Sequence, residues 1–77
     1  MHELSLMEDL VAAIGEEAKG ARVHVVRLIV GRRSCASIEA LRFCFDVCAN
    51  GTALEGASLD IVESDGDELR VRELEVS

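Results

Sequence analysis

The chain has no Trp, Tyr or Pro, and its two aromatic side chains are Phe43 and Phe45. At 77 residues and 49% hydrophobic content it is long enough for one domain with one core, and that core must be aliphatic. A domain of this size has a small stability margin unless a metal or a second subunit adds to it.

Positive charge is also scarce. The chain carries 8 Lys and Arg against 15 Asp and Glu, a net charge of −7 at pH 7. Binding to nucleic acid or to an anionic membrane surface requires clustered cations, so this composition argues against both. No apolar run approaches the roughly 18 residues that span a bilayer, and no secretory signal is visible. The three cysteines, without C-x-x-C spacing, are expected to be reduced, which predicts a cytoplasmic protein.

Signatures of catalysis are absent from the sequence. The glycines Gly51, Gly56 and Gly66 fit neither nucleotide-binding pattern, and no Ser or Cys lies in a recognisable nucleophile motif. Only two histidines, His2 and His24, are available as bases. The sequence therefore predicts a protein that is not an enzyme.

Hydrophobic periodicity predicts two helices and an interior strand. Ser5 opens a capping box, and apolar residues then recur at helical spacing up to Gly20, which predicts a first helix from about residue 5 to 19. The β-branched run 23–30 is apolar on both faces and predicts an interior strand. A second helix is expected over residues 37–49.

The last third of the chain predicts two more strands. Residues 57–61 alternate between apolar and polar, as in a strand with one buried face. Residues 69–76 form the other strand, and a change of parity between Val71 and Leu74 indicates a bulge or a strand covered on both faces. The Asp-Gly pair at 65–66 favours a tight turn, so we expect these two strands to form a hairpin.

These elements define the expected fold class. It is α+β in the order α-β-α-β-β, a small three-stranded sheet with two helices packed on one face. Residues 1–77 are expected to form a single domain, and the free edges of such a sheet are compatible with a homodimer.

The first three residues, Met1, His2 and Glu3, are a candidate metal site. A residue as large as His at position 2 blocks removal of the initiator Met, so we expect a free amine at Met1. That amine, the deprotonated backbone nitrogen of His2 and His2 Nδ1 can close fused chelate rings around one ion. The Glu3 backbone nitrogen, or another donor, can supply the fourth position, and four nitrogens in a plane select Cu(II) or Ni(II) over Zn(II). The alternative is a frayed terminus with no role in binding.

Three stretches carry a resemblance to a known family: MHELSL at 1–6, EALRFCFD at 39–46 and GDELRVRELEV at 66–76. In this order they resemble the HypA/HybF family of nickel-incorporation accessory proteins for NiFe hydrogenase and, in some bacteria, urease. The resemblance implies that the N-terminal amine, His2 and the backbone nitrogen of Glu3 bind Ni(II). It also implies a metallochaperone that passes nickel to a HypB-like GTPase and on to the hydrogenase large subunit, or to urease accessory proteins.

The sequence departs from this family in one region. Family members carry a second domain between the last two strands, where two C-x-x-C pairs hold structural zinc. Here Glu63 is followed at once by residues 64–67 and the closing strand, so the zinc-binding domain is absent at about 63–67 and no zinc is expected. Either a naturally shortened relative or an excised insertion has this pattern, since a short turn can replace such an insertion.

The remaining candidate side chains are assigned to the fold. Cys44 and Cys48 lie on the apolar stripe of the second helix and are expected in the core, whereas Cys35 is expected in an exposed loop. His24 alternates with valines along a strand and is expected to be solvated. The alternative function is a protein–protein interaction or assembly module that has the same fold and binds no metal.

Overall fold

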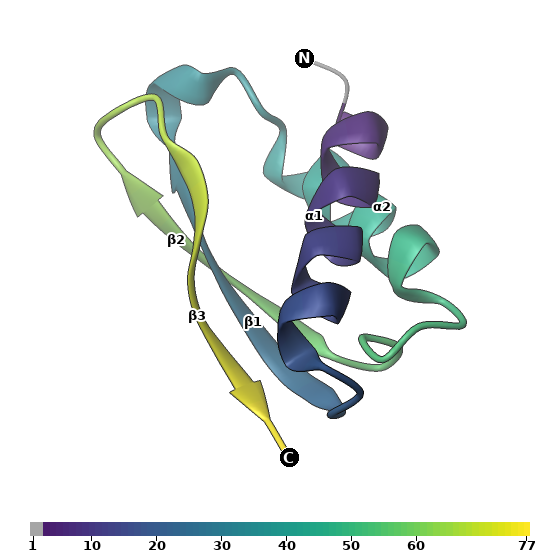
Figure 1. Ribbon diagram of the computed structural model, residues 1–77. Coiled ribbons are helices and arrows are strands. Elements are labelled where there is room, and N and C mark those ends of the chain that lie inside the picture. Colours follow the sequence, from purple (N-terminus) through teal and green to yellow (C-terminus); the bar gives the residue numbers. More distant parts are fainter. Residues whose placement is uncertain (1–2) are drawn as a thin grey trace.

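Two helices pack on one face of a three-stranded sheet (Figure 1). The computed structural model describes residues 3–77. Its elements follow in the order α1 (Glu3–Ala18), β1 (Val23–Gly31), the 3-10 turn η1 (Arg32–Ser34), α2 (Ile38–Ala49), β2 (Ser58–Ser64) and β3 (Leu69–Val76). The predicted α+β class and the predicted α-β-α-β-β order are therefore confirmed.

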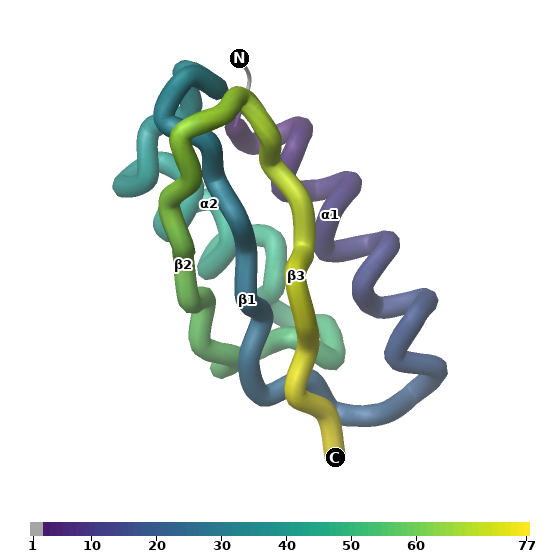
Figure 2. Tube along the Cα trace, turned by 90° about the vertical axis from the view of Figure 1, so that its left-hand side faces the viewer, coloured from purple at the N-terminus to yellow at the C-terminus, as the bar shows by residue number. Residues whose placement is uncertain are grey.

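Strand β1 lies in the middle of the sheet, between β2 and β3 (Figure 2). It runs parallel to β2 and antiparallel to β3. The predicted hairpin of the last two strands is wrong, because these strands are not neighbours. Helix α2 connects β1 to β2, and such a helical crossover is what allows two parallel strands to pair. The connection from β2 to β3 must consequently cross the end of β1.

This crossing depends on Gly31, the last residue of β1. The Gly31 amide donates to the Glu68 carbonyl at 2.6 Å, and the Arg33 amide donates to the Gly66 carbonyl at 3.0 Å. A Cβ at Gly31 would overlap the carbonyl group of Gly66 and lie 2.8 Å from the Asp67 nitrogen. Only glycine lets the crossing segment approach β1 this closely.

The two faces of β1 have different environments. On the helix side Val26, Leu28 and Val30 are buried. The opposite face carries Arg27, whose guanidinium contacts three carboxylates of the neighbouring strands. The distances are 2.7 Å to Glu75, 3.2 Å to Asp60 and 3.3 Å to Glu73. The hydrogen bond with Glu75, together with the charges of Glu73 and Glu75, raises the pKa of Arg27.

The predicted bulge in the last strand is confirmed. Arg27 pairs with Glu73 and the next residue, Leu28, pairs with Val71, so the register shifts between them. The extra residue on β3 is Arg72. The bulge returns Val71 and Leu74 to the same side of the sheet, where both pack against the core.

The two helix starts differ in how well the sequence predicts them. Helix α1 already includes Glu3, so Ser5 lies within it and the predicted capping box at Ser5 is wrong. Its end is as predicted: α1 stops at Ala18, and Gly20 follows with φ +88°. Helix α2 follows an N-cap at Ser37, whose hydroxyl accepts from the Ala40 amide at 3.3 Å.

The core is aliphatic except for Phe45, as the composition predicts. Its largest fully buried side chains are Phe45, Met7, Leu28, Leu41, Leu54, Val23 and Val26. Leu54 comes from the connection between α2 and β2, which therefore closes one end of the core. Cys44 is buried and Cys48 packs against the core, while Cys35 is exposed, as predicted for all three.

Candidate metal centre

Of the three residues of the predicted metal site, the structure describes Glu3. Met1 and His2 lie outside the described residues. Glu3 is the first residue of α1, and its carboxylate Oε2 accepts a hydrogen bond from the Ser37 amide at 3.2 Å. This contact joins the start of α1 to the N-cap residue of α2, 34 positions later in the chain.

Helix electrostatics favour this contact. The N-terminus of a helix carries partial positive charge, because its first amides have no acceptor within the helix. The Glu3 carboxylate lies against the N-terminus of α2 and complements that charge. Figure 1 shows the start of α1 beside the segment that leads into α2. The side chain of Glu3 thereby anchors the first turn of α1, and the backbone nitrogen of Glu3 is the candidate metal donor.

His24 is too far along the chain to join this site. It is exposed on β1, as predicted, and β1 begins at the end of the molecule opposite the start of α1 (Figure 1). The 16 residues of α1 separate the two ends, about 24 Å at 1.5 Å per residue. Any metal held at the first three residues would not have His24 as a ligand.

No second metal cluster is present among residues 3–77: no three His, Cys, Asp or Glu side chains are grouped so that they could hold an ion. Cys44 and Cys48 are part of the core packing. Burial, and to a smaller extent the charge of Glu8 and the neighbouring Cys44, raises the pKa of Cys48, which disfavours the thiolate that a metal ligand needs.

Arg32, the first residue of the basic pair after β1, has a structural role. Arg32 Nη1 lies 2.9 Å from Asp65 Oδ1, and Arg32 Nε lies 3.9 Å from Glu63 Oε2. These contacts join η1 to the end of β2 and to the connection that crosses β1. They account for Arg32 without a nucleic-acid ligand.

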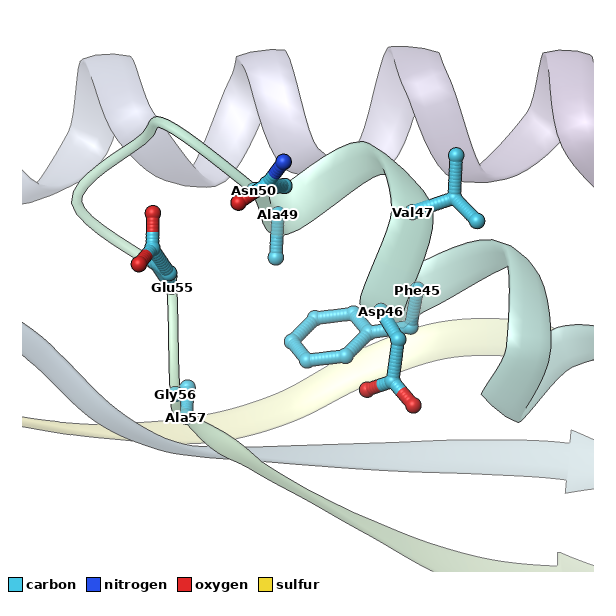
Figure 3. Close-up of a pocket in the computed structure, with 8 residues that line it drawn as sticks. All are labelled: Phe45, Asp46, Val47, Ala49, Asn50, Glu55, Gly56 and Ala57. Carbon is cyan, nitrogen blue, oxygen red and sulfur yellow. The ribbon is translucent and has the colours of Figure 1, made fainter.

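A hollow of about 330 Å³ lies between the end of α2 and the connection to β2 (Figure 3). The ring of Phe45 forms its base, and the carboxylates of Asp46 and Glu55 lie on either side of it. Glu55 Oε1 accepts from the Gly51 amide at 2.7 Å, so this carboxylate closes the turn after α2. The hollow is therefore assigned to the fold of the connection between α2 and β2.

Comparison with known proteins identifies the family. A family model described as "Hydrogenase/urease nickel incorporation, metallochaperone, hypA" matches residues 1–69. The chain belongs to the HypA family. The resemblance seen in the sequence is therefore confirmed, and the matched range includes Met1, His2 and Glu3.

The relatives are hydrogenase maturation factors by name. HypA of Nostoc punctiforme is 48% identical over 66 residues, which cover 86% of this chain and 58% of that protein. HypA of Xanthobacter autotrophicus is 46% identical over 69 residues, covering 86% of this chain and 61% of that protein. The chain thus spans about three fifths of the length of the curated relatives it matches.

Two solved structures share the fold. The solution structure of the Ni metallochaperone HypA from Helicobacter pylori matches with a TM-score of 0.85 at 21% identity. The match covers 99% of this chain and 97% of that chain. A second HypA solution structure has a TM-score of 0.83 at 23% identity and covers 100% and 97% of the two chains. Neither α1 nor α2, nor any other helix within residues 3–77, has the length and apolarity to cross a membrane.

The sequence did not predict a second feature of the structure, an exposed apolar surface on the two helices. Leu4, Phe43 and Val47 are large hydrophobic side chains on the two helices, and all three are exposed. Phe43 and Val47 are four residues apart and lie off the apolar stripe that contains Leu41 and Phe45. Two large hydrophobic residues at helical spacing but outside the buried stripe are the sequence signal that could have predicted an exposed apolar surface.

Proposed function

We propose that this chain is the nickel-binding module of a metallochaperone. It holds one Ni(II) at Met1, His2 and Glu3 and delivers it for the maturation of NiFe hydrogenase or urease. The observation that carries the proposal is the family match over residues 1–69, whose description names nickel incorporation. Relatives named hydrogenase maturation factors support the destination.

The chemistry of the three residues fits the ion. The amine of Met1, the backbone nitrogen and Nδ1 of His2, and the backbone nitrogen of Glu3 can form fused chelate rings. A planar set of nitrogens suits Ni(II) and is unsuited to Zn(II), which prefers a tetrahedron. Every donor must lose a proton to bind, so affinity for nickel decreases as the pH falls.

The folded domain supports such a site through Glu3. Its carboxylate bonds to the Ser37 amide, so the first turn of α1 is fixed against the start of α2. One donor would then be held by the domain, while Met1 and His2 precede the helix. The cargo of a metallochaperone must also leave, so such a site has to give the recipient access to the metal.

The proposal includes the recipient and the absence of zinc. The recipient is the nickel-inserting, HypB-like GTPase implied by the family, followed by the hydrogenase large subunit or urease accessory proteins. The connection between β2 and β3 is only residues 65–68, and no cysteine lies in it. We therefore expect purified protein to contain no stoichiometric zinc, which elemental analysis measures directly.

The test compares the two histidines. His2→Ala removes a chelating nitrogen and should abolish stoichiometric Ni(II) binding in a calorimetric titration, while the far-UV circular dichroism stays unchanged. His24→Ala is the matched control, because His24 is exposed on β1, and it should bind nickel like the parent. Retained one-to-one binding in His2→Ala would refute the assignment. Nickel-independent binding to the GTPase would instead favour a non-metal interaction module with this fold.

A further inference from the structure

The exposed apolar side chains are concentrated on the helices. Among residues 3–77, four large hydrophobic side chains are exposed: Phe43 at 70%, Val47 at 52%, Val76 at 50% and Leu4 at 49%. Three of them belong to α1 or α2, and only Val76 lies elsewhere, at the end of β3. Contiguous exposed apolar surface on a small domain is a frequent mark of an interaction site.

A groove runs between the outer sides of the two helices. Its volume is about 400 Å³, and its apolar lining is Leu4, Val11 and Ala12 from α1 with Val47 and Cys48 from α2. Figure 3 shows the Val47 side chain directed away from the Phe45 ring, toward the side on which α1 lies. The groove is thus open to solvent on the face opposite the sheet.

Phe43 extends this surface along α2. It precedes Val47 by four residues, so the two side chains lie one above the other on the same face of the helix. Leu4 marks the other end of the surface, directly after Glu3. We call the set Leu4, Phe43, Val47 and the groove lining the outer groove.

The charged side chains of α1, which forms one wall of the outer groove, all have the same sign. Helix α1 contains acids at Glu3, Glu8, Asp9, Glu16 and Glu17 and no Lys or Arg. Glu8 itself lines the groove. Helix α2 has one base, Arg42, and its Nη1 donates to the Leu59 carbonyl at 2.7 Å, so this charge is directed toward β2.

We propose that the outer groove is the docking surface for a basic, amphipathic segment of a partner protein, whose apolar side chains enter the groove and whose Lys or Arg residues face the acids of α1. A second copy of this chain is disfavoured as the occupant, because each copy carries a net charge of −7 and presents the same acids. A helix-in-groove mode matches both the apolar lining and the charged rim.

This inference rests on the proposed function in one respect, the presence of a protein recipient for nickel. A segment bound along the outer groove reaches Leu4, the neighbour of Glu3. Docking there would therefore bring the recipient next to Glu3, the described residue of the proposed nickel site. It explains why a chain this small leaves Leu4 and Val47 half exposed.

The test uses a synthetic probe with this chemistry. The probe is a fluorescein-labelled amphipathic peptide of about four helical turns, with Leu on one face and Lys on the other. Its binding is measured by fluorescence anisotropy, against a control peptide in which Glu replaces every Lys. Binding of the Lys peptide should weaken at higher salt, since the charges involved are exposed. The Glu peptide should not bind.

Two variants locate the binding surface. Val47→Glu places a charge in the outer groove and should weaken the Lys peptide at least about tenfold. Val76→Glu is the matched control, since Val76 is equally exposed but lies on β3, and its binding should match the parent. Far-UV circular dichroism verifies that both variants are folded.

Three results would overturn the proposal. They are equal binding of both peptides, unchanged binding to Val47→Glu, or a homodimer in sedimentation that Val47→Glu dissociates. The last result would assign the outer groove to a second copy. His2→Ala separates this proposal from the nickel site, because it should retain peptide binding whatever its effect on nickel.

Discussion

The inner and outer sides of the two-helix layer both carry large hydrophobic side chains, but these are buried on the inner side and exposed on the outer side. On the inner side, Phe45 is 1% exposed and packs with Leu41 and Met7 against the sheet. On the outer side, Phe43 is 70% exposed although it is only two residues away on the same helix. Core packing therefore accounts for the hydrophobic character of the inner residues, but it does not account for that of the exposed outer residues.

The contrast separates residues that hold the fold from residues available for binding. The inner stripe follows helical spacing, because the sheet removes it from water. The exposed side chains of the outer groove, Leu4, Phe43 and Val47, lie outside this core. Substitution of these exposed side chains should therefore leave the domain folded.

The largest expected effect comes from the two phenylalanines. Phe45→Ala leaves a cavity in the core and should lower the free energy of unfolding by about 3–5 kcal/mol. Phe43→Ala should change it by less than about 0.5 kcal/mol, as for an ordinary surface substitution. Urea denaturation followed by circular dichroism measures both, since the chain has no Trp or Tyr for fluorescence. Similar losses in both variants would contradict the division into two sides.

The next effect concerns the crossing over β1. Gly31→Ala forces a Cβ against the Gly66 carbonyl and should destabilise the fold by about 1–3 kcal/mol, the usual cost of overpacking. Gly15→Ala is the control, because nothing lies within 4 Å of a Cβ there and the residue is inside α1. It should stabilise by about 0.5–1 kcal/mol. The same denaturation experiment gives both changes in the free energy of unfolding. Changes of the same sign in the two variants would contradict the close approach at Gly31.

The smallest expected effect is kinetic. Burial raises the pKa of Cys48, so less of it is thiolate at pH 8 and its alkylation should be slow. The exposed Cys35 should react faster, as followed residue by residue by mass spectrometry. Raising the pH increases the thiolate of Cys48. Glu8→Gln removes a nearby negative charge and should move this increase to lower pH, whereas Glu16→Gln should not. Identical pH profiles for Cys35 and Cys48 would contradict the burial of Cys48.

Local patterns in the sequence predicted the elements well. The run 23–30, rich in β-branched residues and apolar on both faces, predicted an interior strand, and β1 is the central strand. The parity change between Val71 and Leu74 predicted the bulge, because side-chain alternation is strict in a regular strand. Ser37 and Gly20 marked the helix ends through capping chemistry that acts over a few residues.

Strand order was not predictable in the same way. The Asp-Gly pair at 65–66 indicates a turn, and both residues lie in the short connection between β2 and β3, but a short connection does not determine which strands pair. That choice depends on the crossover through α2, which places β2 beside β1 in parallel and leaves β3 the other edge. The early start of α1 also escaped prediction, because the contact from Glu3 to the Ser37 amide joins residues far apart in sequence.

The candidate sites also differ in whether they depend on local sequence or on long-range contacts. Donor chemistry at Met1, His2 and Glu3 can be read from three consecutive residues, and it stays a prediction. The outer groove could not be read in this way, since it requires α1 and α2 to lie side by side. The exposed Val47 on α2 can be assigned to a groove only once α1 is known to lie beside it.

The most direct test of the central claim is a Ni(II) titration followed by visible absorption and circular dichroism. It compares protein that begins at Met1 with protein extended by two residues before Met1. The extension removes the free amine and leaves the fold intact. We expect a one-to-one complex with the d–d absorption of square-planar Ni(II) in the first protein and its loss in the second. An identical complex in both would contradict a nickel site at Met1, His2 and Glu3.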